Sequence, residues 1–161
     1  AQSKLRAWIR HVVCNAAAVE ATRSHGSSAG IPVTTQVVMP SRTITLEPLG
    51  EEALACLKGL VEPFVRGHRQ PIPFFPRASS VLAKETRRGP EKSDAERLEE
   101  ARKAFQDAGW NGKQPEGADP YVHLCWRGID PFAEPWDDET LQLARSVFGP
   151  LQASMREGAA G

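Results

Sequence analysis

The chain has 161 residues, 40% of them hydrophobic and 25% charged, which is ordinary for a soluble globular protein and enough for one domain with its own core. Its net charge is zero, which argues against a free nucleic-acid-binding protein held by bulk positive charge. No apolar run is long enough to cross a membrane, and the opening residues lack the pattern of a signal peptide.

The charged residues are divided unevenly along the chain. Residues 1–89 contain 12 Lys or Arg and 6 Asp or Glu, whereas residues 90–161 contain 8 and 14. This division predicts two differently charged faces, although ion pairing within the chain would use the charges equally well.

The three cysteines, Cys14, Cys56 and Cys125, are widely spaced and form no C-x-x-C pair. This pattern predicts reduced, mostly buried thiols in a cytoplasmic protein. The chain starts without an initiator methionine and enters its first helix at about residue 4, so we expect a piece of a longer protein.

The first predicted element is an amphipathic helix over residues 4 to about 22. Its apolar side chains recur every three or four residues, and they form one wide stripe. Arg6 and Arg10 are four residues apart and share a face outside that stripe. His11 has no second ligand nearby and is expected to be structural.

A β-hairpin and a second helix are predicted next. Residues 33–39 and 43–46 are rich in β-branched side chains and flank a Pro-Ser-Arg turn. Apolar spacing predicts a helix from Glu51 to Gly67. Pro63 removes one backbone donor from this helix and is expected to kink it.

Residues 70–80 form a proline-rich strap. Three prolines in six residues favour a stiff, extended segment, and Phe74 and Phe75 lie within it. The strap is expected to pin these aromatics against neighbouring helices, either as a buried crossover or as a ledge for a partner protein. The serines at its end are expected to cap a short helix over residues 81–84.

The charged residues 85–92 are predicted to be a flexible linker. A capping box at Ser93 and Glu96 then predicts a helix that continues to Ala108. Residues 121–126 are aromatic and apolar enough to predict a buried strand, with His123 half-buried in it.

A final helix is predicted to start at Asp137 or Asp138 and to break at Gly149-Pro150. The tail from Glu157 is expected to be frayed.

The strap sequence P-I-P-F-F-P-R-A-S-S resembles a segment near the end of RecC, the gamma subunit of exodeoxyribonuclease V. Three other segments resemble the same family in the same order: R-A-W-I-R-H at 6–11, D-P-Y at 119–121 and V-F-G-P-L at 147–151. The resemblance covers nearly the whole chain, as the C-terminal part of a much longer subunit.

This resemblance implies an α/β fold, the C-terminal part of a PD-(D/E)xK nuclease-like fold with helices packed on a small sheet. We expect a single subdomain over residues 1–161. The family is similar in fold to the nuclease domain of RecB but lacks its catalytic residues.

The sequence contains no catalytic or metal-binding motif that would contradict this. The two predicted strands and the residue after them contain one acid, Glu47, whereas a PD-(D/E)xK site needs an Asp and a Glu-x-Lys on adjacent strands. Walker, zinc and nucleophile-elbow patterns are missing from the sequence. The acids between 130 and 139 lack EF-hand spacing and fit a helix N-terminus better.

The resemblance also implies partners. RecC-like subunits join RecB-like and RecD-like subunits in an ATP-driven helicase-nuclease that processes double-strand DNA ends and recognises Chi. We therefore expect a non-catalytic scaffold that contacts a partner through Phe74, Phe75, Arg77 and Arg127. It would need no metal or cofactor of its own, since ATP and Mg would act through other subunits.

Two alternatives remain open. A DNA-contacting module would use Arg6, Arg10, Arg87 and Arg88 on one basic face. A magnesium-dependent nuclease fragment rests on the fold of the family alone. In either case the full complex brings the chain to DNA, and no membrane partner is expected.

Overall fold

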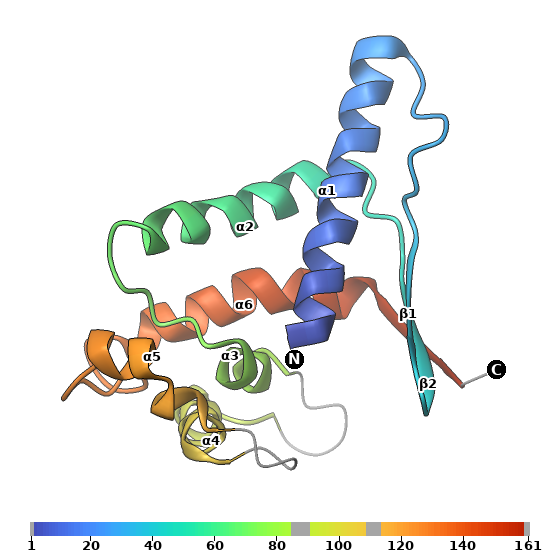
Figure 1. Ribbon diagram of the computed structural model, residues 1–161. Helices are drawn as coiled ribbons and strands as arrows, with labels where there is room; N and C mark the ends of the chain where they lie inside the picture. The colour runs from blue at the N-terminus through green and yellow to red at the C-terminus, as the bar shows by residue number, and fades with distance from the viewer. Residues whose placement is uncertain (1, 85–90, 109–113, 160–161) are drawn as a thin grey trace. The chain divides into compact units, whose positions relative to one another are not determined.

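Figure 1 shows the computed structural model, an α/β arrangement in which helices accompany a three-stranded antiparallel sheet. The structure describes residues 2–84, 91–108 and 114–159. Its contacts divide the chain into two compact units. Unit 1 is Pro63–Gly149, and unit 2 combines Gln2–Glu62 with Pro150–Gly161.

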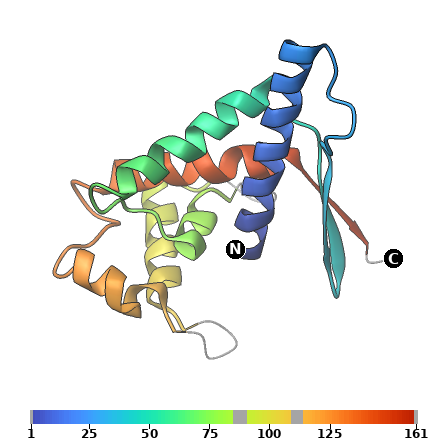
Figure 2. The same ribbon diagram turned by 45° about the horizontal axis from the view of Figure 1, so that its top comes forward.

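The sheet belongs to unit 2. Strands β1 (Thr35–Met39), β2 (Arg42–Leu46) and β3 (Met155–Ala159) lie side by side in that order, each antiparallel to its neighbour (Figures 1 and 2). Ile44 and Leu46 of β2 are buried, as the two-residue period of a strand requires. The predicted hairpin is therefore confirmed.

Helix α1 (Gln2–His25) lies against β1 and completes the core of this unit. Trp8, Val12 and Ala16 are buried on it at successive helical turns. The predicted amphipathic helix is confirmed, and it begins two residues earlier and ends about three residues later than the sequence indicated.

Two buried polar side chains of α1, His11 and Asn15, connect the helix to the sheet. His11 is 0% exposed, and its Nε2 donates to the carbonyl of Glu47 at 3.0 Å. Because this acceptor fixes the proton on Nε2, Nδ1 accepts from the Thr35 hydroxyl at 3.1 Å. Burial lowers the pKa of His11, and the bond to the Glu47 carbonyl offsets part of that effect. The imidazole is thus held neutral, in the structural role expected of it.

The Asn15 amide has three backbone partners. Its Nδ2 donates to the carbonyls of His11 and Val33, both at 2.9 Å, and its Oδ1 accepts from the Leu49 N–H at 3.0 Å. A buried donor or acceptor left unpaired costs about 1–3 kcal/mol. This single side chain therefore fixes the chain before β1 and after β2 against α1.

Unit 1 is mainly helical. Its elements are the second part of α2 (Glu52–Gly67), α3 (Pro76–Leu82), α4 (Asp94–Gln106), the 3-10 helix η1 (Glu116–Ala118), α5 (Pro120–Cys125) and the first part of α6 (Asp137–Ser154). Helix α3 packs against α4 (Figures 1 and 2). The predicted capping box is confirmed, because the Ser93 hydroxyl accepts from the Glu96 N–H and the Glu96 carboxylate accepts from the Ser93 N–H.

The prediction of a buried strand over residues 121–126 is wrong. The Asp119 carboxylate accepts from the N–H groups of Tyr121 and Val122, and Pro120 occupies the first helical position, so the segment begins as helix α5. The cap and the proline outweigh the β propensity of the aromatic run. His123 is correspondingly exposed and not half-buried.

The end of the chain also differs from the prediction. Helix α6 continues through Gly149 and Pro150 to Ser154, with Leu151 buried beyond the proline. Pro150 removes the bond to the Ser146 carbonyl, but burial of the last turn compensates. The expected frayed tail forms β3 as far as Ala159, because β2 offers a free edge to its backbone.

Smaller corrections concern α3 and the cysteines. Helix α3 starts at Pro76, five residues before the expected helix, and the Ser79 hydroxyl accepts from the N–H of the N-cap residue, Phe75. All three cysteines are free, but none is buried, and Cys125 is exposed.

Most of the predicted linker, residues 85–90, lies outside the described residues, and the single-subdomain prediction remains a prediction. None of the helices in the described part of the chain combines the length and the apolar character needed to span a membrane.

The neutral His11 predicts a pH-dependent stability. Its pKa is about 6.5 in the unfolded chain and lower in the folded one. The contribution of neutral His11 to the free energy of unfolding is therefore complete above pH 6.5. It is lost as the pH falls from there through the pKa of the folded state, because in this interval the unfolded chain binds a proton that the folded chain does not. Urea unfolding at pH 8 and pH 5 should show this loss, and the H11Q variant should show a smaller one. An identical pH dependence in that variant would contradict the assignment.

Candidate protein-protein interface

The two phenylalanines of the strap have different environments. Phe75 is 3% exposed, and its ring packs against Phe105, Trp126 and Phe132 with centroid distances of 4.6, 5.9 and 5.9 Å. Phe74 is half-buried and stacks on Phe148 at 5.9 Å. The strap thus fastens its aromatics to the core of unit 1. Because Phe75 is buried, it is not accessible to a partner protein. A partner contact by the half-buried Phe74 remains a prediction.

Arg77, the third predicted interface residue, is engaged within unit 1. Its guanidinium donates to the carbonyl of Asp107 at 2.8 Å and to the Asp107 carboxylate at 3.2 Å. The backbone N–H groups of Arg77 and Ala78 donate to the two carboxylate oxygens of Glu116, at 2.7 and 2.9 Å. The Glu116 carboxylate therefore accepts hydrogen bonds from N–H groups in the first turn of α3 that have no partner within the helix. The N-cap residue, Phe75, cannot supply this acceptor, because its side chain has no polar atom.

The Glu116 contact was missed in the sequence because the two partners are far apart along the chain. It depends on a close approach of η1 to α4. A Cβ on Gly117 would lie 2.6 Å from Cε1 of Phe105, so only glycine fits there without displacing the ring.

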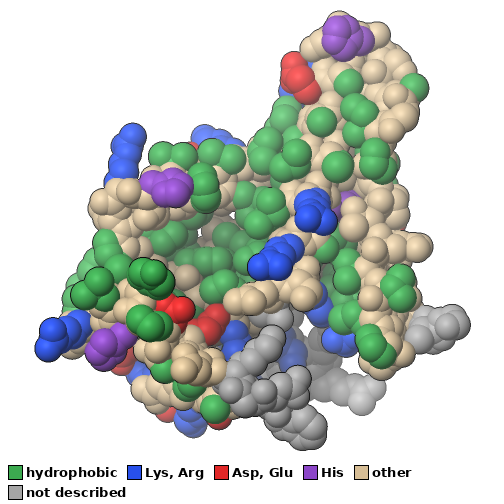
Figure 3. Space-filling view, in the orientation of Figure 1, with side chains coloured by type: hydrophobic (Ala, Val, Ile, Leu, Met, Phe, Trp, Pro, Cys, Tyr) green, Lys and Arg blue, Asp and Glu red, His purple; other side chains and the backbone are tan. Residues whose placement is uncertain are grey.

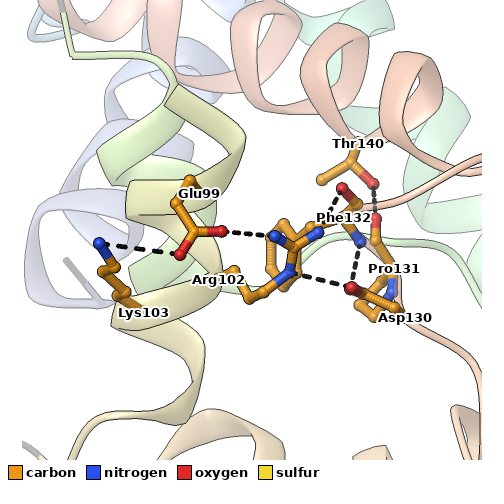
Figure 4. A network of polar contacts seen from close by, with 7 residues as sticks. All are labelled: Glu99, Arg102, Lys103, Asp130, Pro131, Phe132 and Thr140. Atoms are coloured by element: carbon orange, nitrogen blue, oxygen red, sulfur yellow. Dashed lines mark hydrogen bonds and ion pairs between the residues drawn. The ribbon is translucent and has the colours of Figure 1, made fainter. Parts of the chain in front are cut away.

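A polar network around Arg102 holds the loop that supplies Phe132 (Figure 4). Arg102 on α4 contacts the carboxylates of Glu99 and Asp130 at 2.5 and 2.9 Å and the Phe132 carbonyl at 3.1 Å. Partial burial lowers the pKa of Arg102, but the bonds and charges of both carboxylates outweigh it and raise the pKa. The Thr140 hydroxyl donates to the Pro131 carbonyl, which secures the same loop from α6.

The fourth predicted interface residue, Arg127, lies two residues after the end of α5, is exposed, and has no hydrogen-bond or ion-pair partner among the described residues. Tyr121 and Leu124 on α5 are 80% and 73% exposed. Of the four predicted interface residues, Arg127 is the most accessible.

The predicted basic face is described in part. Arg6 and Arg10 are exposed on α1, one turn apart, and neither forms an ion pair within the described residues. Arg87 and Arg88 lie outside the described residues.

Helix α2 carries an exposed apolar face that was not predicted as a site. Val61, Phe64 and Val65 are 47%, 65% and 44% exposed, and Ala53 is the only buried residue of this helix. Their spacing places them on one face, which we call the α2 face. The ring of His68 meets Phe64 edge-on at 4.5 Å. The spacing was visible in the sequence, but spacing does not reveal whether a stripe is covered.

The acids of the sheet are few. Glu157 is the only acidic residue in the three strands, and its carboxylate pairs with Arg42 at 3.3 Å and Lys4 at 3.9 Å. Within the described part of the chain, no group of three or more His, Cys, Asp and Glu residues is placed to hold a metal.

Comparison with known proteins gives one match. The family model for the RecC C-terminal domain matches residues 1–87, more than half of the chain. The curated proteins and the solved structures contain no match.

Two phenylalanines give a paired test of which aromatics stabilise the fold. F75A removes the ring shared by three aromatic neighbours, and we expect it to lower the free energy of unfolding by about 3–5 kcal/mol. F64A removes a mainly solvated ring, and we expect a change of about 0.5 kcal/mol or less. Urea unfolding of both variants measures the difference, and equal losses would contradict these environments.

Proposed function

The chain belongs to the RecC C-terminal domain family, and we propose that it is a non-catalytic scaffold module that docks against a partner subunit. The family implies a role in exodeoxyribonuclease V, the RecBCD complex. RecB-like and RecD-like subunits are the proposed partners. Processing of double-strand DNA ends and Chi recognition would be properties of the assembled complex.

The observation that carries this proposal is the α2 face. Three large apolar side chains are exposed together on one face of a single helix, and such a stripe is typical of a helix that a partner covers. The Arg66 guanidinium pairs with the Glu139 carboxylate of α6, so the last turns of α2 are held in unit 1 by contacts that leave Phe64 and Val65 free.

The sheet supports a non-catalytic role. Its one acid, Glu157, forms ion pairs with the side chains of Lys4 and Arg42. Metal-dependent hydrolysis in a PD-(D/E)xK fold instead needs several free carboxylates on adjacent strands. We further propose that the antiparallel sheet and its helices are the C-terminal part of such a nuclease-like fold. The module would need no cofactor of its own and would work in the cytoplasm.

Co-purification with separately produced RecB-like and RecD-like subunits tests the docking proposal. We expect one of them to be retained, and we expect V61S and F64S together to raise the Kd by about tenfold or more, because both side chains lose apolar contact area. The matched control is V38S on β1, where Val38 is 77% exposed outside this face. Retention that is unchanged by the α2 substitutions, in folded protein, would exclude this face as the docking site.

A DNA-contacting module is a second candidate, because Arg6 and Arg10 are exposed and without ion pairs among the described residues. In that case affinity for DNA should fall steeply with salt, and R6A with R10A should reduce the slope of log K against log salt by about two. Fluorescence titration with duplex and single-stranded DNA measures both.

Absence of DNA binding even at low salt would exclude this candidate. Magnesium-dependent degradation of the DNA in the same titration, lost on mutation of one carboxylate, would instead favour the nuclease alternative.

A further inference from the structure

Helices α3 and α4 pack against each other in opposite directions, and an arginine side chain joins them at each end. Arg77, in the first turn of α3, donates to the carbonyl and the carboxylate of Asp107, the residue that follows α4. At the other end, Arg97 near the start of α4 donates to the carbonyl of Lys84, two residues after the end of α3. The helix pair is therefore held by one polar contact site at each end.

The guanidinium of Arg97 bridges both ends of the connection between α3 and α4. Its Nη1 donates to the Lys84 carbonyl at 2.9 Å, and its Nε donates to the Lys92 carbonyl at 3.2 Å. A third contact, from Nη2 to the Glu91 carboxylate, measures 3.9 Å. A guanidinium carries five N–H donors in a fixed planar fork, so this one side chain holds two carbonyls at a set separation.

Arg97 is more buried than most charged side chains of α4. Figure 3 shows acidic and basic side chains close together at the lower edge of the molecule, where α4 lies. The Arg97 side chain is only 12% exposed, and its two hydrogen-bond acceptors are backbone carbonyls. Hydrogen bonds from a charged donor are stronger than neutral ones, and solvent screens them less at a partly buried site.

The two ends of the connection depend on Arg97 to different degrees. Lys92 has a second anchor, because its ammonium group pairs with the Glu100 carboxylate, and the Ser93 capping box follows it directly. The Lys84 N–H donates only to the Val81 carbonyl within its own helical turn. Among the residues that the structure describes, the polar link from the end of α3 to α4 therefore runs through Arg97 alone.

We propose that Arg97 is a clasp that holds the end of α3 on α4 and sets how often this end opens. Arg97 is a positioning residue here, because it acts through the carbonyls of Lys84 and Lys92. When its guanidinium is released, the last turn of α3 opens, while the capping box keeps the start of α4 closed. Local openings of this kind cost less free energy than global unfolding, so loss of one contact changes their frequency. The clasp is independent of the proposed docking function.

Hydrogen exchange of the intact subunit, followed by mass spectrometry, tests the clasp. The reporting amides are those of Ala83 and Lys84, which donate hydrogen bonds in the last turn of α3. We expect R97A to raise their exchange rate by about tenfold. The R97K variant keeps the positive charge but loses the fork that reaches both carbonyls, so we expect it to resemble R97A.

The matched control is R145A. Arg145 pairs with the Asp94 carboxylate at the same end of α4 and contacts neither carbonyl, so its removal should leave the two reporting amides at the wild-type rate.

Three results would overturn the proposal. The first is an unchanged exchange rate in R97A, and the second is a wild-type rate in R97K, since charge alone would then be sufficient. The third is an equal acceleration in peptides from β1 and β2, which would indicate global destabilisation and not local opening.

Discussion

The packing of Phe75 against three other aromatic rings is the contact on which unit 1 depends. The strap brings Phe75 to this position, α4 supplies Phe105, the residue that follows α5 is Trp126, and the loop before α6 supplies Phe132. Each of these segments is short or irregular and could not be stable alone. Their shared ring contacts replace the regular hydrogen bonding that a longer helix or a sheet would have provided. The accessible surfaces of this unit are therefore supported from a single apolar centre.

The sequence predicted those elements whose causes are local. The β-hairpin follows from two alternating runs around a turn, and α4 follows from the Ser93–Glu96 capping box. Helix α5 also has a local cause, the Asp119-Pro120 start, which a prediction based on the apolar run 121–126 alone does not use. The end of the chain differs from its prediction for a non-local reason. Strand β3 has little β propensity of its own, and it exists because β2 leaves an edge to pair with.

The candidate interface was predicted only in part for a similar reason. An aromatic residue in a proline-rich loop fits a core anchor and a docking ledge equally well, and the choice depends on what lies opposite it. Phe75 meets three aromatic rings, whereas Phe64 on α2, with ordinary helical spacing, is 65% exposed. Sequence spacing defines which side chains share a face, but it does not define which face is covered.

Unit 2 is discontinuous in the sequence, and this has a consequence for how the chain acquires its structure during synthesis. The whole of unit 1 lies between β2 and β3 in the sequence. The Glu47 N–H nevertheless donates to the Ser154 carbonyl at 2.9 Å, so this hydrogen bond joins residues on either side of unit 1 in the chain. Unit 1 is contiguous, so its core can form as soon as its own residues have left the ribosome. The third strand emerges only after the whole of unit 1, and pairs this distant in sequence form slowly. Until then β2 keeps an unpaired edge, which leaves the emerging chain open to wrong strand pairing throughout the synthesis of unit 1.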